Sequence, residues 1–179
     1  MDVLRTIMDE IECVVSKVEK EEIDRVVNLI RKDRRIFGAG EGRSGFSAKG
    51  FAMRLMHLGY TVYVVGETIT PALREGDLLV GVSGSGKSIS VIDAARKAKE
   101  KKGVVIAVTS KKESPLAGYA DQVLIIPGTV KGDTGESRGS IQLLSSLFDQ
   151  SLHIVLDAVC LIISYRDDTA NESATGAHW

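Results

Sequence analysis

Cysteine, aromatic residues and net charge are all scarce in this sequence. Its 179 residues include two cysteines and 5% aromatic residues, and the formal net charge is -1. Cys13 and Cys160 are far apart, in neither a disulfide framework nor a metal-ligand spacing, so we expect two reduced thiols in core helices and no bound metal. The near-zero charge gives no electrostatic basis for binding nucleic acid or an anionic membrane.

The sequence also shows no signal for export or for membrane insertion. The N-terminus carries Asp2, Arg5, Asp9 and Glu10 where a signal peptide needs an apolar run. No apolar run approaches the length of a membrane span. What remains, with 44% hydrophobic and 26% charged residues, is typical of one globular domain. We therefore expect a cytoplasmic protein.

Apolar periodicity divides residues 1–179 into three parts of a single domain: two helices in 1–32, an α/β core in 35–165 and a tail with few apolar anchors, expected to be loose, in 166–179. The predicted strands are residues 35–39, 61–65, 78–82, 104–108 and 122–126. The predicted helices are one ending near Leu58, one at 89–101, a short turn-helix near 115–119 and a long one from Ile141 to Ile162. Because strands alternate with helices, the sheet should be parallel. The N-terminal helices either cover this sheet or contact another subunit.

The most informative segment is residues 78–88, an apolar run that breaks into a Gly/Ser loop before a helical pattern. Glycines let backbone N–H groups approach a ligand, serines add hydroxyl donors, and the helix directs its positive end to the same place. Lys87 would oppose the helix dipole there unless an anion were bound. The alternative is an ordinary turn with a capping serine. We predict a phosphate cradle formed by Ser83, Gly84, Ser85, Gly86, Lys87 and Ser88.

Two loops match nucleotide-binding fingerprints. Residues 40–45 fit GxGxxG, and Glu67 ends the following strand, as in dinucleotide-binding proteins. Residues 81–88 fit GxxxxGK(S/T), which is typical of nucleotide triphosphatases. Such an enzyme also needs an acidic residue after a neighbouring apolar strand, where this chain has Thr109-Ser110 and Pro127-Gly128. A dinucleotide enzyme would leave the second Gly/Ser loop without a purpose.

A single small phosphorylated ligand explains both loops better. In a doubly wound sheet of order 2-1-3-4-5, the loops after strands 1 and 3 flank one crevice at the carboxyl edge. A phosphate on residues 83–88 would leave the rest of the ligand against residues 40–44. The polar segment 128–139, whose length is typical of functional or mobile loops, follows the last strand.

Several of these segments together resemble 6-phospho-3-hexuloisomerases, which belong to the sugar isomerase (SIS) domain family. The resemblance is specific from about Ile36 to Gly86 and weakens beyond Ile126. It rests on residues 40–45, 48–49, 51–59, 64–71 and 83–86. It implies a three-layer, flavodoxin-like α/β domain with a five-stranded parallel sheet, and a homo-oligomer, a tetramer or a dimer, without metal or cofactor.

The activity that this resemblance implies is interconversion of hex-3-ulose 6-phosphate and fructose 6-phosphate, in the ribulose monophosphate pathway. By position, the cradle would hold the phosphate, and Arg43, Ser44 and Glu67 would line the sugar pocket. Moving a carbonyl along the chain through a cis-enediol requires a base. The family's glutamate near the start of its last long helix corresponds to Asp149, and a family histidine near the C-terminus to His178, thought to reach a neighbouring subunit.

Some positions depart from the family pattern or have simpler interpretations. Aspartate replaces glutamate at 149, Lys87 replaces a glutamate and Leu143 a proline. Asp149 is alternatively a solvated helix residue, His178 the end of a tail, and Arg43 and Glu67 an ion pair with each other. His57 and His153 are more typical of packed or surface positions. A non-catalytic SIS module that binds a sugar phosphate as a sensor or regulator is the alternative function.

Overall fold

Five apolar runs form one parallel sheet in the computed structural model, which describes residues 2–178. The strands are β1 (Ile36–Gly40), β2 (Val62–Val64), β3 (Leu78–Val82), β4 (Val104–Thr109) and β5 (Gln122–Ile125). Their order is β2-β1-β3-β4-β5, and every adjacent pair is parallel. All residues of β3 are buried, which is typical of a parallel strand covered on both faces. The predicted sheet and strand order are confirmed.

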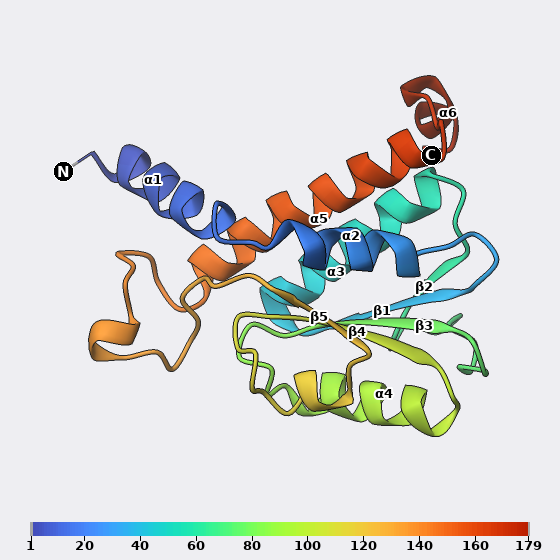
Figure 1. The fold of residues 1–179 in the computed structure, drawn as a ribbon, viewed down its shortest axis with the longest axis horizontal. Helices are drawn as coiled ribbons and strands as arrows, with labels where there is room; N and C mark the ends of the chain where they lie inside the picture. The colour runs from blue at the N-terminus through green and yellow to red at the C-terminus, as the bar shows by residue number, and fades with distance from the viewer. Residues whose placement is uncertain (1, 179) are drawn as a thin grey trace.

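Helices cover both faces of this sheet, so the domain has three layers (Figure 1). On one face lie α3 (Gly42–His57) and α5 (Ser146–Arg166), and on the other α4 (Ile89–Glu100) with a 3₁₀ turn at Ala117–Tyr119. The N-terminal helices α1 (Val3–Val15) and α2 (Lys20–Leu29) pack against α5, and α2 also packs against β5. The N-terminal helices therefore cover the sheet within their own chain. The tail forms α6 (Asn171–Gly176), which contacts α3 and has no buried residue.

Alternate side chains of the strands enter two separate cores. In β1, Ile36 packs in the core under α3 and α5, while Phe37 packs in the core over α4. The neighbouring β3 repeats this alternation with Leu78 and Leu79, as the two-residue period of a strand requires. Each fully buried aliphatic or aromatic side chain contributes about 1.5 to 3 kcal/mol. These two cores hold the strand ends, and thus the loops, in fixed register.

Helix α5 begins later than its apolar pattern predicted. Ile141 and Leu144, expected inside the helix, precede it and are 46% and 63% exposed. Leu144 has a φ of 52°, a left-handed conformation that a right-handed helix cannot include. Glu10 of α1 accepts hydrogen bonds from the Ile141 amide at 2.8 Å and from Gln142 Nε2 at 2.9 Å. The segment before α5 is therefore held by the N-terminal helix.

Two further expectations need correction. Helix α5, with 21 residues, is long and apolar enough to cross a membrane by length and composition alone, so the expectation that no run approaches a span is wrong. More than half of its apolar window is buried, as in a helix of a protein core. Cys160 of α5 is buried as expected, and burial raises the pKa of its thiol to about 12. Cys13 is exposed, because it lies on the outer face of α1.

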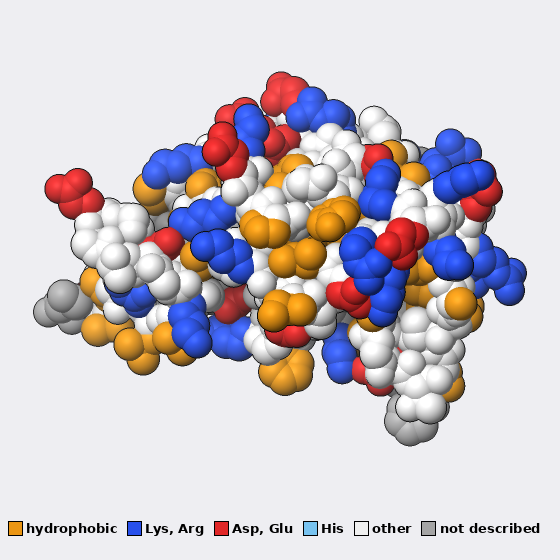
Figure 2. Space-filling model, turned by 90° about the horizontal axis from the view of Figure 1, so that it is seen from below, with side chains coloured by type: hydrophobic (Ala, Val, Ile, Leu, Met, Phe, Trp, Pro, Cys, Tyr) orange, Lys and Arg blue, Asp and Glu red, His pale blue; other side chains and the backbone are white. Residues whose placement is uncertain are grey.

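The face on the α4 side mixes charges of both signs. Figure 2 shows basic and acidic side chains interspersed around a central group of hydrophobic ones. On α4 itself, Asp93 pairs with Arg96 and Lys97, and Arg96 also pairs with Glu100. Exposed pairs of this kind contribute little to stability. This face carries no continuous surface of one charge.

Candidate functional site

The loops after β1 and β3 leave the sheet side by side. The register pairs Gly40 with Val82, so residues 41–45 and 83–88 start at the same level of the carboxyl edge. Glu41 accepts a hydrogen bond from Ser90 Oγ, which joins the start of α3 to the first turn of α4. The two loops thus lie side by side at the carboxyl edge, where the strand order predicts a crevice.

The Gly/Ser loop is fixed from the β4 side. The Gly84 carbonyl accepts hydrogen bonds from Thr109 Oγ1 at 3.1 Å, and from the amide and hydroxyl of Ser110 at 3.0 and 2.9 Å. The Gly86 carbonyl accepts one from the Leu116 amide at 3.0 Å. These bonds hold the loop by its carbonyls and leave its other face toward the crevice.

Glycine is required at two positions of this loop. Gly86 has a φ of +64°, and a Cβ there would lie 2.1 Å from Ser114 Oγ. A Cβ on Gly84 would lie 2.8 Å from Val130 and 2.9 Å from Phe148 of α5. Any larger residue would push the loop away from its supports. The glycines therefore serve close packing beneath the cradle.

The serines supply donors on the crevice side. The hydroxyls of Ser83 and Ser88 are 3.0 Å apart, and Ser85 Oγ accepts from the Lys87 amide at 3.3 Å. Within residues 2–178, no hydrogen bond uses the amide N–H of Ser85 or Ser88. Ser88 begins α4 without a side-chain cap. Free amides, hydroxyls and a helix N-terminus in one loop form an environment suited to an anion.

Asp149 lies opposite, in the first turn of α5. Its side chain is only 7% exposed, and Ser44 Oγ donates to its Oδ1 at 2.7 Å. Arg43 Nε is 4.0 Å from its Oδ2, while Arg43 also donates to Ser146 Oγ at 2.7 Å. The start of α3 and the start of α5 thus converge on one buried carboxylate. Asp149 is no solvated face residue.

The surroundings of Asp149 suit a general base. Burial raises the pKa of its carboxyl above the ordinary value, although the Ser44 hydrogen bond and the Arg43 guanidinium act in the opposite direction. A carboxylate with a raised pKa holds a proton more readily and is a better base near neutral pH. Beside it lies a cavity of about 430 Å³ lined by Arg43, Phe46, Ser47, Asp149, Gln150, His153 and Ile154.

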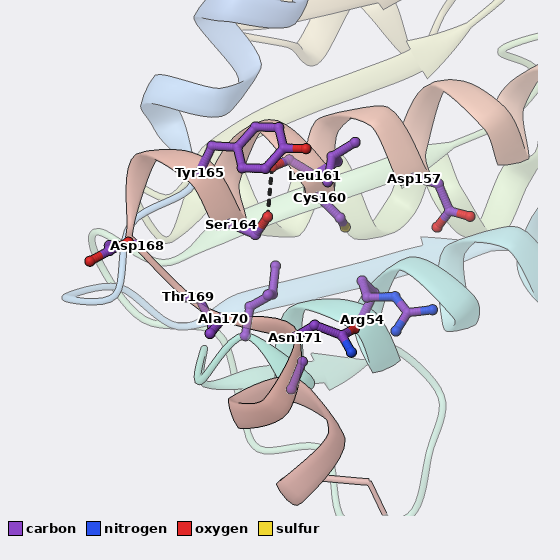
Figure 3. A pocket seen from close by; sticks show the side chains of 12 residues that line it. Arg54, Asp157, Cys160, Leu161, Ser164, Tyr165, Asp168, Thr169, Ala170 and Asn171 are labelled. Carbon is purple, nitrogen blue, oxygen red and sulfur yellow. Dashed lines mark hydrogen bonds between the residues drawn. The ribbon is translucent and has the colours of Figure 1, made fainter.

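A larger cavity, of about 700 Å³, lies at the other end of the molecule. Figure 3 shows it between Arg54 of α3, the last turns of α5 and the start of α6. The part of α5 that lines it starts at Asp157, two turns beyond Asp149. Neither Asp149 nor any cradle residue lines this cavity. Size alone is therefore a poor guide to the reactive site here.

Two expected site residues lie away from this crevice within one chain. Glu67 pairs with Lys49 at 2.6 Å beside an apolar hollow at the β2 edge, which excludes the alternative pairing with Arg43. The His178 ring lies 5.2 Å from that of His57, at the far end of α3 from Ser44. His57 is buried, and burial, Arg54 and His178 lower its pKa. His57 is a packed residue, as one interpretation had it.

Sequence reasoning missed three polar residues of the crevice. Glu41 and Ser90 bridge its two sides, and Ser146 positions Arg43. Glu41 directly follows a strand, a position that indicates a site residue, whereas Ser146 had no local signal because α5 was expected to start earlier. Within the described part of the chain, no three His, Cys, Asp or Glu side chains form a group that could hold a metal ion.

Comparison with known proteins shows the same resemblance over most of the chain. Residues 29–154 match the SIS domain. The 3-hexulose-6-phosphate isomerase of Bacillus subtilis (strain 168) is 40% identical over 172 residues, which are 96% of this chain and 93% of that protein. The 3-hexulose-6-phosphate isomerase of Mycobacterium gastri is 44% identical over 156 residues, 87% of this chain and 78% of that one.

Solved structures agree. A hypothetical protein from Methanococcus jannaschii, whose crystal structure infers a molecular function of 3-hexulose-6-phosphate isomerase, superposes with a TM-score of 0.83 at 30% identity. The match covers 100% of this chain and 98% of that one. The resemblance predicted from residues 36–86 is confirmed, and the chain belongs to the SIS domain family.

Proposed function

We propose that this protein is a ketose-phosphate isomerase that interconverts hex-3-ulose 6-phosphate and fructose 6-phosphate. The observation that carries the proposal is the position of Asp149, a buried carboxylate with a raised pKa in the first turn of α5. The residue before it, Phe148, packs against Gly84 of the loop that is rich in anion donors. The names of the relatives from Bacillus subtilis and Mycobacterium gastri support the choice of substrate. We place the reaction in the cytoplasm and in the ribulose monophosphate pathway.

In this proposal the cradle binds the phosphate and thereby fixes the sugar chain. The donors are the hydroxyls of Ser83, Ser85 and Ser88 and the loop amides that no other residue uses. Gly84 and Gly86 keep the loop close to its supports, and exposed Lys87 adds a positive charge. Charge-assisted hydrogen bonds of this kind contribute about 1.5 to 3 kcal/mol each. The phosphate therefore supplies most of the binding energy.

Asp149 then moves one proton between two neighbouring carbons. As a carboxylate it removes the proton from C2 of the hexulose, and the C3 carbonyl becomes the enediolate oxygen. Within the cis-enediolate the hydroxyl proton passes from O2 to O3. The proton on Asp149 then returns to C3 while the oxygen on C2 becomes the new carbonyl, so the base is regenerated. The Arg43 guanidinium, 4.0 Å from Asp149 Oδ2, stabilises the negative charge that develops on oxygen. Ser44 keeps the base oriented.

Glu67 and His178 do not belong to the site of their own chain in this proposal. Neither is near Asp149 in its own chain, so in this proposal a contribution of either residue to a crevice comes from a neighbouring copy. The chemistry needs only proton transfer and charge stabilisation, and the proposal includes no cofactor or metal.

We further propose that the chain forms a homo-oligomer, a tetramer or a dimer. Helix α5 is apolar almost all round, which is typical of a helix covered on every side. Its outer face leaves Ile154, Leu161 and Tyr165 43%, 51% and 75% exposed. Leu161 and Tyr165 also line the larger cavity of Figure 3. Light scattering should give a mass above one chain, and a Leu161→Asp variant should shift it downward.

The decisive experiment is conversion of hex-3-ulose 6-phosphate, followed by coupled detection of fructose 6-phosphate. We expect turnover by the parent protein without added metal or nucleotide. A protein that binds fructose 6-phosphate in calorimetry but shows no turnover would favour the alternative, a SIS module that senses a sugar phosphate. Thermal melts with fructose 6-phosphate, with NAD and with ATP and magnesium test the two nucleotide-binding hypotheses. A specific ligand stabilises the fold by mass action, so the melting temperature should rise most with fructose 6-phosphate.

A further inference from the structure

Glu41 is an acidic residue that links the loop after β1 to the start of α4, and the proposed function gives it no role. It begins α3 but makes no side-chain cap to that helix. Its carboxylate instead accepts a hydrogen bond from Ser90, in the first turn of α4. The side chain therefore spans the opening between the two loops.

The first turn of α4 explains this orientation. A helix N-terminus favours negative charge, yet α4 has no acidic residue in its first turn, and its N-cap Ser88 makes no capping bond. The Glu41 carboxylate supplies the missing negative charge from across the crevice. It does so at the same helix end whose amides and serines form the cradle.

A carboxylate and a phosphate at the same helix end compete. Two like charges a few ångströms apart near a protein surface repel strongly enough to change an equilibrium several-fold. Glu41 also occupies the Ser90 hydroxyl, a donor two residues beyond Ser88. A phosphosugar that enters must therefore overcome the charge of Glu41 and displace its contact with Ser90.

We propose that Glu41 sets the affinity for phosphorylated ligands, as an internal anion that occupies the N-terminus of α4 in the empty crevice. This inference rests on the proposed phosphate-binding role of residues 83–88. Because the repulsion grows with the charge of the ligand, Glu41 weakens the binding of a phosphate dianion more than that of a singly charged anion. Glu41 raises the KM for the sugar phosphate and speeds the release of the phosphorylated product.

The test is calorimetric titration of the full chain with inorganic phosphate and with fructose 6-phosphate. Glu41→Gln preserves the shape of the side chain and removes its charge. Glu75→Gln is the matched control, because Glu75 is 74% exposed at the opposite edge of the sheet and forms an ion pair with Lys102, at 3.8 Å. We expect Glu41→Gln to bind both ligands about threefold to tenfold more tightly at low salt, and Glu75→Gln to match the parent.

Salt and a second variant sharpen the result. Because the effect is a charge effect, the gain of Glu41→Gln should shrink at about 1 M salt, where the Debye length falls to about 3 Å. Ser90→Ala frees the carboxylate from α4 and should tighten binding less than Glu41→Gln does. Unchanged affinity for both ligands in Glu41→Gln would overturn the inference. Weaker binding of fructose 6-phosphate alone would also overturn it, since Glu41 would then hold a sugar hydroxyl.

The same titration keeps this inference separate from the proposed function. A parent protein without isomerase turnover whose Glu41→Gln variant still binds phosphate more tightly would reject the proposed reaction and retain the role of Glu41. A parent protein that turns over substrate while Glu41→Gln leaves both affinities unchanged would support the proposed reaction and reject the role of Glu41. A parent protein that binds neither ligand would overturn both the cradle and the role of Glu41.

Discussion

Two buried aspartates at opposite edges of the sheet differ in how many partners they have. Asp77, 5% exposed, lies just before β3 at the amino edge, and Asp149, 7% exposed, lies near the carboxyl edge. Asp77 accepts hydrogen bonds from two nitrogens of Arg35, with Nε at 2.9 Å, and from the Arg74 amide at 2.6 Å. Asp149 accepts one side-chain hydrogen bond, from Ser44.

The difference separates a structural carboxylate from a reactive one. Asp77 has a guanidinium and an amide as partners, and its hydrogen bonds raise the pKa of Arg35. These hydrogen bonds use its carboxylate to fix the segment between β2 and β3. Asp149 is equally buried, but it has one oxygen without a close donor and an Arg43 nitrogen at 4.0 Å. An under-paired buried charge is expensive, and such groups concentrate at functional sites.

The largest expected effect is on catalysis by Asp149→Asn. Removal of a general base costs about 10²- to 10⁴-fold in rate, so kcat for hex-3-ulose 6-phosphate should fall by that amount. Affinity for fructose 6-phosphate should stay near that of the parent, because the cradle is untouched. Steady-state kinetics and calorimetry on the same preparation measure both quantities.

The stability of this variant gives an independent check. Since the pKa of Asp149 is raised in the folded state, its carboxyl stabilises the fold fully below its ordinary pKa of 3.8, and this contribution is lost as pH rises through the raised value. At neutral pH the charged carboxylate therefore destabilises the fold, and the melting temperature of Asp149→Asn should be no lower than that of the parent. An Asp149→Asn variant with full turnover would exclude Asp149 as the base, and Glu136 or a partner's His178 would be tested next.

The second effect is on folding, at Asp77. Asp77→Asn leaves Arg35 without its carboxylate, and breaking a buried pair in this way costs about 3 kcal/mol. Urea unfolding should show that loss, while kcat of the folded fraction should match the parent. Asp93→Asn is the control, because Asp93 is 39% exposed in its pairs on α4 and should lose much less stability. Equal losses in both variants would remove the distinction between the two aspartates.

The sequence predicted the fold well because its signals are local. Strand runs such as Leu78–Val82 are uninterrupted apolar segments, and the glycines after β1 and β3 mark the two loops by composition alone. The start of α5 was predicted wrongly, because Leu144 fits the apolar period but adopts a left-handed conformation. The Glu10 hydrogen bonds that hold this segment join residues about 130 positions apart, and no local pattern contains them.

The candidate site was predicted in part for the same reason. The cradle is one continuous segment, so its residues could be identified together, and Asp149 followed from the family resemblance. The contacts of Asp149 with Ser44 and Arg43 and of Glu41 with Ser90 cross from one helix to another. Glu67 and His178 were expected at the pocket, but side-chain pairing with Lys49 and packing beside His57 place them elsewhere in the chain.

The smallest expected effect is at Ser44, whose hydroxyl donates the hydrogen bond that Asp149 accepts. That bond favours the charged carboxylate and lowers its pKa, against the larger effect of burial. Ser44→Ala should therefore raise the pKa of Asp149 further and move the acid limb of the kcat/KM profile to higher pH. At the plateau, kcat should fall by at most about fivefold, the equivalent of one hydrogen bond of about 1 kcal/mol. Ser164→Ala, at the far end of α5 where the hydroxyl donates to the Leu161 carbonyl, should leave the profile unchanged. If the acid limb of Ser44→Ala moved to lower pH, the Ser44 hydroxyl would be stabilising the protonated acid, and Asp149 would act as a proton donor instead of the base.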